Sequence, residues 1–312
     1  APGEEITITV WYGNVNNELI DEIVNAGKYY INVDEIILDG RTLDNYNVTT
    51  KNVDYIISPR KIVIAPEYQV AVTYDGLVYE YPVDKFVYES SDTLVGNDTI
   101  TVEVVFKDDL GNILEPKNAQ EYYMYIVGHT FTNADVVETN YEIRYSTIGV
   151  LFEIIPRNIV ITLKPIDSVV YDGLYHYYPY SEKDAVIADN MVDGEYIYAN
   201  NVSYFYQDGS EEAPLHAGKY DICIEEVSYS DNTLDTNYNI VDVIPTEFEI
   251  TPREIDIEFI PLGDITYDGN YHGYDDSIAN NFKVTSELGI VGNEELYVYV
   301  DYDVLIDGNW EY

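Results

Sequence analysis

The sequence contains one cysteine, Cys223, and no run of about 18 apolar residues. A single thiol excludes an intrachain disulfide and a cysteine cluster for metal binding. The lack of a long apolar run predicts that no helix of this chain spans a membrane. The 312 residues must therefore gain their stability from packed cores.

Basic residues are also scarce, because 15 Lys and Arg stand against 58 Asp and Glu, for a formal net charge of −43. Nucleic acids and anionic lipid surfaces would be repelled by such a chain. We expect no cofactor and no tight metal site, but a loosely bound cloud of Ca²⁺ or other cations.

The residues that are abundant favour strands. Hydrophobic residues make up 46% of the chain, 34 residues are tyrosines, and many segments are rich in Val, Ile and Thr. These residue types prefer pleated sheets, and no segment shows an extended helical period. The composition therefore predicts an all-β protein.

Two short motifs recur at a constant spacing. Pro-Arg and Tyr-Asp-Gly each occur three times, and their successive copies are 97 and 96 residues apart. Two independent motifs that share one period indicate a single structural unit of about 97 residues copied along the chain. The motif residues are Pro59, Arg60, Tyr74, Asp75, Gly76, Pro156, Arg157, Tyr171, Asp172, Gly173, Pro252, Arg253, Tyr267, Asp268 and Gly269.

Three further motifs keep the same order within each unit. They are Gly96-Asn97-Asp98 with Gly194-Glu195 and Gly292-Asn293-Glu294, Ala26-Gly27-Lys28-Tyr29 with Ala217-Gly218-Lys219-Tyr220, and Asn45-Tyr46 with Asn140-Tyr141 and Asn237-Tyr238. A degenerate copy of the second, Ala119-Gln120-Glu121-Tyr122, lies in the middle of the chain.

The register of the motifs divides the chain into four parts. Residues 1–58 correspond to the C-terminal part of a unit, 59–155 and 156–251 to complete units, and 252–312 to the N-terminal part of another. We expect the chain to be a window from a longer array. Its first residues lack the basic and apolar regions of a signal peptide, so we expect that a signal was removed or that the chain comes from inside a longer one.

Alternating apolar residues flank each Pro-Arg pair and predict strands with one buried face. They are Tyr55, Ile57, Ile62 and Ile64, then Phe152, Ile154, Ile159 and Ile161, then Phe248, Ile250, Ile255 and Ile257. Because proline donates no ladder hydrogen bond, we place the domain boundary at Pro-Arg. No flexible linker separates the units, which predicts stiff joints.

We expect each unit to be an immunoglobulin-like β-sandwich, with a β-grasp-like unit as the alternative. Asp-Gly predicts a turn in each Tyr-Asp-Gly, and its tyrosine is expected to enter the core. Asp109-Leu110-Gly111, Asp208-Gly209 and Asp307-Gly308-Asn309 predict hairpin turns. The tyrosine of Ala-Gly-Lys-Tyr is typical of the tyrosine corner of such sandwiches.

The five motifs in this order resemble the MBG and YDG-type repeats of large bacterial surface proteins, over essentially the whole chain. The resemblance implies immunoglobulin-like repeats in an extracellular stalk or adhesin of the cell surface, without catalytic residues. The degenerate copy at Glu121 departs from the pattern.

Candidate reactive groups are few. We interpret the aspartate of Tyr-Asp-Gly as a turn residue in preference to a Ca²⁺ ligand or catalytic carboxylate, because no dense calcium loop surrounds it. The four histidines form no metal or catalytic pattern, so no enzyme is predicted. Lys85, Lys183 and Lys283 are expected to pair with acidic neighbours in preference to forming isopeptide crosslinks. Sequons at Asn47, Asn97 and Asn201 are possible glycosylation sites.

The leading hypothesis is a structural extracellular repeat protein that forms a stalk or filament on the cell surface, with neighbouring repeats or copies of itself as partners. The alternative is an adhesin module that binds glycans or a protein on a host or neighbouring cell, since tyrosines suit wet interfaces. End-to-end contact and strand exchange both remain open as routes to assembly.

Overall fold

The computed structural model describes residues 6–38, 46–182, 184–261, 263–273, 282–298, 304–306 and 309–311. In these residues strands dominate, and the only helical elements are two short 3-10 turns, η2 (Glu138–Asn140) and η3 (Asp235–Asn237). The predicted all-β class is therefore confirmed. The chain divides into two compact units, Ala1–Pro156 and Arg157–Tyr312.

The first unit begins with a four-stranded antiparallel sheet in the order β2-β1-β3-β4. Its strands are β1 (Ile6–Gly13), β2 (Leu19–Ile20), β3 (Gly27–Leu38) and β4 (Val53–Ile57). Many apolar side chains of this sheet are exposed, including Ile8 on β1 and Tyr55 on β4. The predicted burial of the alternating residues is therefore wrong at Tyr55.

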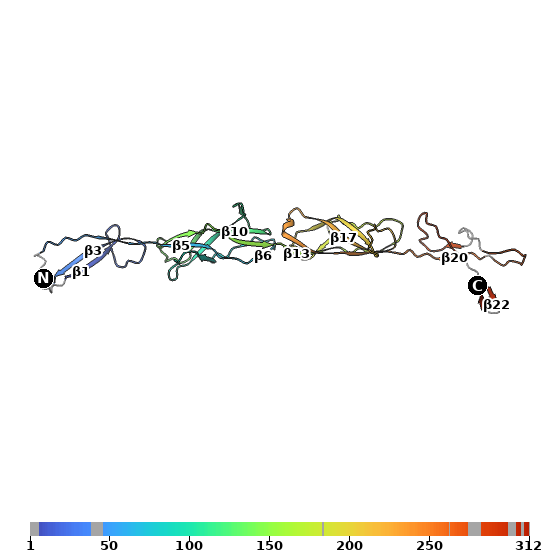
Figure 1. Ribbon diagram of the computed structural model, residues 1–312, viewed down its shortest axis with the longest axis horizontal. Coiled ribbons are helices and arrows are strands. Elements are labelled where there is room, and N and C mark those ends of the chain that lie inside the picture. The colour runs from blue at the N-terminus through green and yellow to red at the C-terminus, as the bar shows by residue number, and fades with distance from the viewer. Residues whose placement is uncertain are drawn as a thin grey trace. The chain divides into compact units, whose positions relative to one another are not determined.

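The rest of the first unit contains two sheets, and Figure 1 labels β5, β6 and β10 among their strands. One has five strands in the order β6-β12-β10-β8-β9, and the other has three in the order β11-β5-β7. Their bounds are β5 (Arg60–Pro66), β6 (Val72–Thr73), β7 (Phe86–Tyr88), β8 (Ile100–Lys107), β9 (Ile113–Leu114), β10 (Gln120–Phe131), β11 (Tyr141–Tyr145) and β12 (Val150–Ile155).

The core of this unit lies between the two sheets. Ile62 and Ile64 on β5 pack with Ile100 and Val102 on β8 and with Ile126 on β10. Over Lys61–Ile64, residues of β5 alternate between buried positions, at Ile62 and Ile64, and exposed or partly exposed ones, as period two requires when a strand has one buried face. The packing is sandwich-like, because each sheet covers the apolar face of the other.

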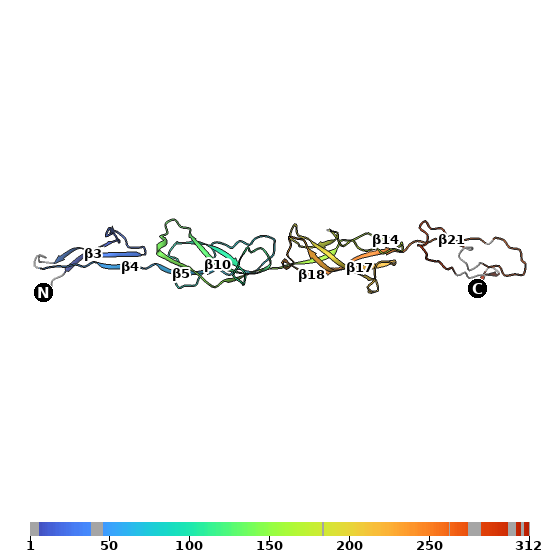
Figure 2. The ribbon, with the colours of Figure 1, turned by 90° about the horizontal axis from the view of Figure 1, so that it is seen from above.

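The second unit has two sheets with the corresponding order of neighbours, β14-β19-β17-β16 and β15-β13-β18. Figure 2 shows β14, β17 and β18 from the direction perpendicular to Figure 1. The bounds are β13 (Arg157–Leu163), β14 (Val169–Val170), β15 (Val186–Ala188), β16 (Ile197–Tyr206), β17 (Gly218–Tyr229), β18 (Tyr238–Ile244) and β19 (Thr246–Thr251).

One crossing of the chain recurs in both units. After β10 the chain passes through η2 and places β11 parallel to β5 in the opposite sheet, and then returns to pair β12 with β10. After β17 it passes through η3, places β18 parallel to β13 and returns to pair β19 with β17. Each pair of sheets is thus tied together by the chain itself.

The last part of the second unit has two short antiparallel pairs. They are β20 (Ile257–Phe259) with β21 (Phe282–Val284), and β22 (Val304–Ile306) with β23 (Asn309–Glu311). The predicted burial is wrong at Ile255 and Ile257, which are 39% and 41% exposed, whereas Ile159 and Ile161 are 1% exposed. The predicted turn residues Asp307 and Gly308 lie outside the described residues.

Candidate functional site: motif residues at the ends of the sheets

The three Tyr-Asp-Gly motifs form the same local turn. In each, aspartate Oδ1 accepts a hydrogen bond of 2.9 Å from the backbone N–H two residues later, at Leu77, Leu174 and Asn270. The glycines have φ of 79°, 77° and 78°, values that side chains disfavour and glycine adopts without strain. The motif therefore encodes an Asx turn that residues of this type form from local contacts alone.

The tyrosines that open these turns have different surroundings. Tyr74 is 2% exposed, Tyr171 is half-buried and Tyr267 is 93% exposed. The prediction that this tyrosine enters the core is therefore confirmed at Tyr74 and wrong at Tyr267. The turn is present in all three copies, but burial requires strands around it.

Two of the turn aspartates also hold a histidine. His176 Nε2 lies 2.9 Å from Asp172 Oδ1, and His272 Nε2 lies 2.7 Å from Asp268 Oδ1. Two hydrogen bonds lower the pKa of Asp172: the one from the backbone N–H of Leu174 has the larger effect, and the one with the His176 side chain has the smaller. These contacts fix the turn, and they engage the same oxygen that accepts the backbone hydrogen bond.

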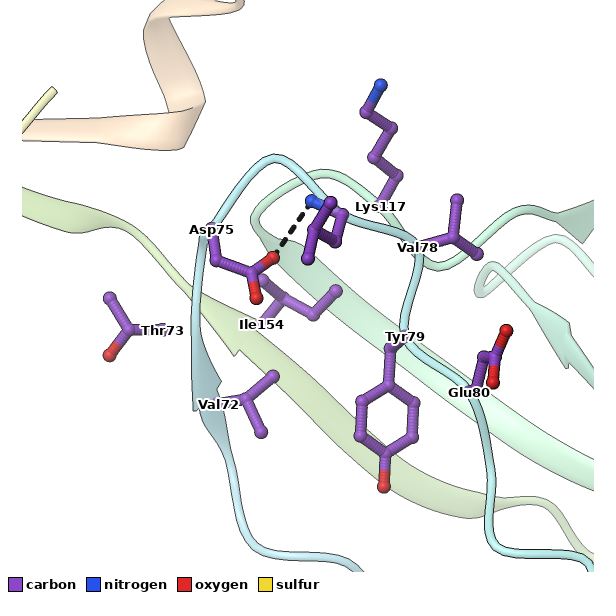
Figure 3. Close-up of a pocket in the computed structure, with 9 residues that line it drawn as sticks. Val72, Thr73, Asp75, Val78, Tyr79, Glu80, Lys117 and Ile154 are labelled. Carbon is purple, nitrogen blue, oxygen red and sulfur yellow. Dashed lines mark hydrogen bonds between the residues drawn. The ribbon is translucent and has the colours of Figure 1, made fainter. Parts of the chain in front are cut away.

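The hollow beside the first turn is a candidate pocket of the first unit (Figure 3). It has a volume of about 580 Å³ and is lined by residues of the turn, of β6 and β12, and of the loop before β10. The carboxylate of Asp75 is engaged by Leu77 N–H, and Lys117 extends away from it in Figure 3. Asp75, Glu80 and Lys117 are the charged residues of this lining.

The tyrosine corner is present in three copies. Tyr29 Oη donates to the backbone oxygen of Asn25 at 2.6 Å, and Tyr122 Oη donates to that of Asn118 at 2.8 Å. Tyr220 Oη donates to the backbone oxygen four residues before it at 2.9 Å. The copy at Tyr122 keeps this contact although its motif reads Ala-Gln-Glu-Tyr, so the tyrosine carries the geometry.

The tyrosines of two Asn-Tyr motifs, Tyr141 and Tyr238, each bind the carboxylate of a Gly-(Asn/Glu) turn. Tyr141 Oη donates to Asp98 Oδ2 at 2.5 Å, and Tyr238 Oη donates to Glu195 Oε2. Both hydroxyls also accept a backbone N–H, from Val95 and Val192 at 3.1 and 3.0 Å. Burial and the Asp98 carboxylate raise the pKa of Tyr141.

The Pro-Arg motif lies between strands, where the missing proline N–H removes no ladder hydrogen bond. Arg60 Nη1 donates to the backbone oxygen of Thr93 at 3.2 Å, and Arg157 Nη1 donates to Asn190 Oδ1 at 3.1 Å. Arg253 Nε is buried and finds no hydrogen-bond partner within the described part of the chain. Pro252 directly follows the last residue of β19.

The motifs gather at opposite ends of the long strands β10 and β17. The tyrosine corner lies at the start of each strand. The segment that follows Tyr-Asp-Gly lies beside it, because the backbone N–H of Tyr79 donates a hydrogen bond to the backbone oxygen of Pro116 and that of His176 donates one to Pro214. The ring pairs Phe131–Tyr141 and Tyr229–Tyr238 mark the other end. We call these the turn end and the carboxylate end. Twelve residues of strand separate them by about 40 Å.

The remaining candidate residues are on the surface. Asn47, Asn97 and Asn201 are all exposed, so their glycosylation stays a prediction. Lys283 Nζ forms an ion pair of 2.8 Å with Glu258, the role expected of it, whereas Lys183 lies outside the described residues. Cys223 is half-buried, and burial raises the pKa of its thiol.

Within the residues that the structure describes, no three His, Cys, Asp or Glu side chains are grouped to hold a metal ion. In the same residues no helix is long and apolar enough to cross a membrane. No protein-family model matches the chain, and a comparison with curated proteins finds no match.

Proposed function

We propose that the chain is a segment of a tandem array of immunoglobulin-like β-sandwich repeats of about 97 residues, as the register of the motifs predicts. The array serves as a structural stalk or filament outside the cell. It resembles the MBG and YDG-type repeats in this respect, and its partners are neighbouring repeats or further copies of the chain.

One observation carries this proposal. The strands of residues 60–155 and those of residues 157–251 follow the same order of neighbours in both sheets, apart from β9, which has no counterpart in the second set. The same motif contacts recur in each, from the Asx turn to the pair of tyrosine and carboxylate. A design repeated along the chain, with the same contacts in each copy, is typical of a structural scaffold.

The large negative charge supports the same role. Chains with 58 acidic and 15 basic side chains repel one another, which keeps long scaffolds apart in solution. Added salt screens this repulsion.

Small-angle scattering of the whole chain tests the array. A compact globule of 312 residues has a radius of gyration of about 20 Å. We expect a value about twice as large for successive sandwiches joined end to end. A measured value near that of a compact globule would contradict the proposal. An antibody against the chain that labels intact source cells, and not only broken ones, tests the extracellular location.

A second candidate function, glycan binding, is favoured by one surface feature. Tyr175 and Tyr177 are 54% and 62% exposed, and their rings stack with centroids 5.7 Å apart and planes 16° apart. The positions 97 residues earlier carry Val78 and Glu80, and those 96 residues later carry Tyr271 and Gly273, so the pair of tyrosines occurs in one repeat. Exposed aromatic faces suit a wet interface with a sugar ring.

A glycan array separates the two functions. If the platform binds sugars, the Tyr175→Ala and Tyr177→Ala double variant loses the binding, while Tyr267→Ala, which removes another exposed tyrosine, keeps it. An array on which the unaltered chain binds no glycan leaves the scaffold as the function.

A further inference from the structure

The first unit contains a contact between its opening sheet and the strands that follow it. Asn140 Oδ1 accepts the backbone N–H of Ala26 at 2.6 Å, and Asn140 Nδ2 donates to Asn25 Oδ1 at 2.9 Å. The oxygen and the nitrogen of one side-chain amide thus both form hydrogen bonds, with two neighbouring residues. Two such hydrogen bonds orient the two segments relative to each other better than a single one does.

A hollow of about 450 Å³ surrounds this contact, with Val24 and Ile57 on one side and Asp98 and Val137 on the other. In the motif register, Asn25 and Ala26 belong to a turn end and Asn140 belongs to a carboxylate end. The contact therefore joins the turn end of one segment to the carboxylate end of the next.

The second unit contains a different contact between the same two kinds of end. Tyr171 Oη donates to Glu294 Oε1, and this contact raises the pKa of Tyr171. A Cβ atom added to Gly173 would lie 2.5 Å from Val291 Cγ1. The Tyr-Asp-Gly turn of one segment thus lies directly against the Gly-Asn-Glu turn of the next.

Glu294 belongs to the same motif as the carboxylates that bind a tyrosine inside the repeats. Asp98 and Glu195 accept the hydroxyls of Tyr141 and Tyr238 from their own repeats. A carboxylate has about four acceptor positions. Four positions are enough to accept one hydroxyl from within the repeat and one from the preceding segment.

We propose that these two contacts are the two sets of hydrogen bonds that stabilise a single kind of joint between successive repeats. In one contact, the asparagine of Asn-Tyr forms hydrogen bonds with the loop before the tyrosine corner. In the other, the tyrosine of Tyr-Asp-Gly binds the carboxylate of the Gly-(Asn/Glu) turn. Together they fix the angle between neighbouring repeats, so the residues that recur along the sequence encode the stiffness of the array.

This inference rests on the proposed array in treating both contacts as parts of one joint design. Each contact can nevertheless be tested separately in the full chain. The background variant Cys223→Ser removes the native thiol, and pairs of introduced cysteines carry spin labels. Thr7→Cys with Glu153→Cys spans the first contact, and Asp221→Cys with Glu287→Cys spans the second; all four positions are exposed.

We expect Asn140→Ala to broaden the label distance distribution in the first pair by about twofold, because the amide contacts that limit the motion are lost. Asn140→Asp keeps the acceptor for Ala26 N–H and should broaden it less. Asn112→Ala is the matched control, since Asn112 Nδ2 donates to Asp108 within a single turn, and its distribution should not change.

Tyr171→Phe should broaden the distribution of the second pair, while Tyr297→Phe, which removes a local hydroxyl contact with Glu295, should not. Unchanged widths in Asn140→Ala and Tyr171→Phe, with strand content preserved by circular dichroism, would overturn the joint. If the distance distributions broaden in these variants but the chain scatters as a compact globule, the two contacts are supported and the proposed array is wrong.

Discussion

Tyr74 and Tyr267 open the same tripeptide and the same turn, yet one is 2% exposed and the other 93%. Their turns are alike to within about a degree of glycine φ and share the aspartate hydrogen bond of 2.9 Å. The difference is in the neighbouring structure. Tyr74 follows β6, which pairs with β12, and its backbone N–H donates to Ile155.

The comparison separates a local property from a tertiary one. An Asx turn needs one carboxylate, one N–H and a glycine, all within four residues. Burial of a tyrosine needs two facing sheets, whose strands come from up to about a hundred residues of chain. The sequence motif specifies the first completely and the second only in part.

Truncation of the two tyrosines should give the largest contrast. Tyr74→Ala removes a fully buried ring and should cost about 3–5 kcal/mol of unfolding free energy. Tyr267→Ala should change it by less than about 0.5 kcal/mol. Hydrogen exchange of the β12 amides in urea measures the first effect locally. Equal protection of β12 in Tyr74→Ala and in the unaltered chain would show that the ring is not part of the core.

Substitution of the turn glycines should separate strain from contact. Gly269→Ala places a side chain at φ 78° with open space around it and should cost about 1 kcal/mol. Gly173→Ala adds a collision with Val291 Cγ1 at 2.5 Å and should cost more. Amide exchange at Leu174 and Asn270 reports the two turns. If Gly269→Ala had the larger effect, the close approach of Val291 would not be a real constraint.

High pH should destabilise the first unit before it affects the exposed turns. Burial raises the pKa of Tyr81 to about 12, from an ordinary value of 10.0. The pKa of Tyr81 is higher in the folded state than in the unfolded state. The contribution of the neutral Tyr81 side chain to stability is therefore fully present below pH 10 and is lost as the pH rises toward 12. Denaturation by urea at several pH values measures the loss.

Tyr81→Phe is the control for the alkaline effect. It lacks the group that titrates, so its stability should fall less steeply over this range, although it also loses the hydrogen bond from Tyr81 Oη to Lys85 at 2.7 Å. A slope equal to that of the unaltered chain would assign the alkaline loss to other groups.

Removal of the exposed ion pairs should give the smallest effects. Lys28 pairs with Asp54 at 2.9 Å, and Lys219 pairs with Glu247 at 2.8 Å, at equivalent places in the two regions. Solvent screens both pairs, so Lys28→Met and Lys219→Met should each leave the free energy of unfolding nearly unchanged. Thermal unfolding in low and high salt would detect a larger contribution as a difference that salt abolishes.

Much of the local structure could be predicted from the sequence. The strands around Pro59 and Pro156 follow from the alternation of apolar residues. The Asx turns and the tyrosine corners follow from short patterns whose hydrogen-bond partners are two to four residues away. The hairpin turn at Asp109-Leu110-Gly111 also agrees with the pairing of β8 and β9.

The contacts that span the sequence could not be predicted. Tyr141 meets Asp98 across 43 residues, Asn140 meets Ala26 across 114, and Tyr171 meets Glu294 across 123. A periodic pattern shows which residues share a face, but it does not show which loops meet at the end of a sheet. The burial wrongly expected at Ile257 and Tyr267 has the same origin, because the pattern records a preference and the surrounding strands decide the outcome.

The lengths of the outermost strands have a further consequence. In the five-stranded sheet both outer strands, β6 and β9, are two residues long, and the outer strand β14 of the second unit is equally short. The remaining outer strand of that sheet, β16, is ten residues long, and its register is broken on both sides of Asn201. Short or irregular borders offer few free backbone groups in line, which is how proteins rich in strands avoid cross-β aggregation.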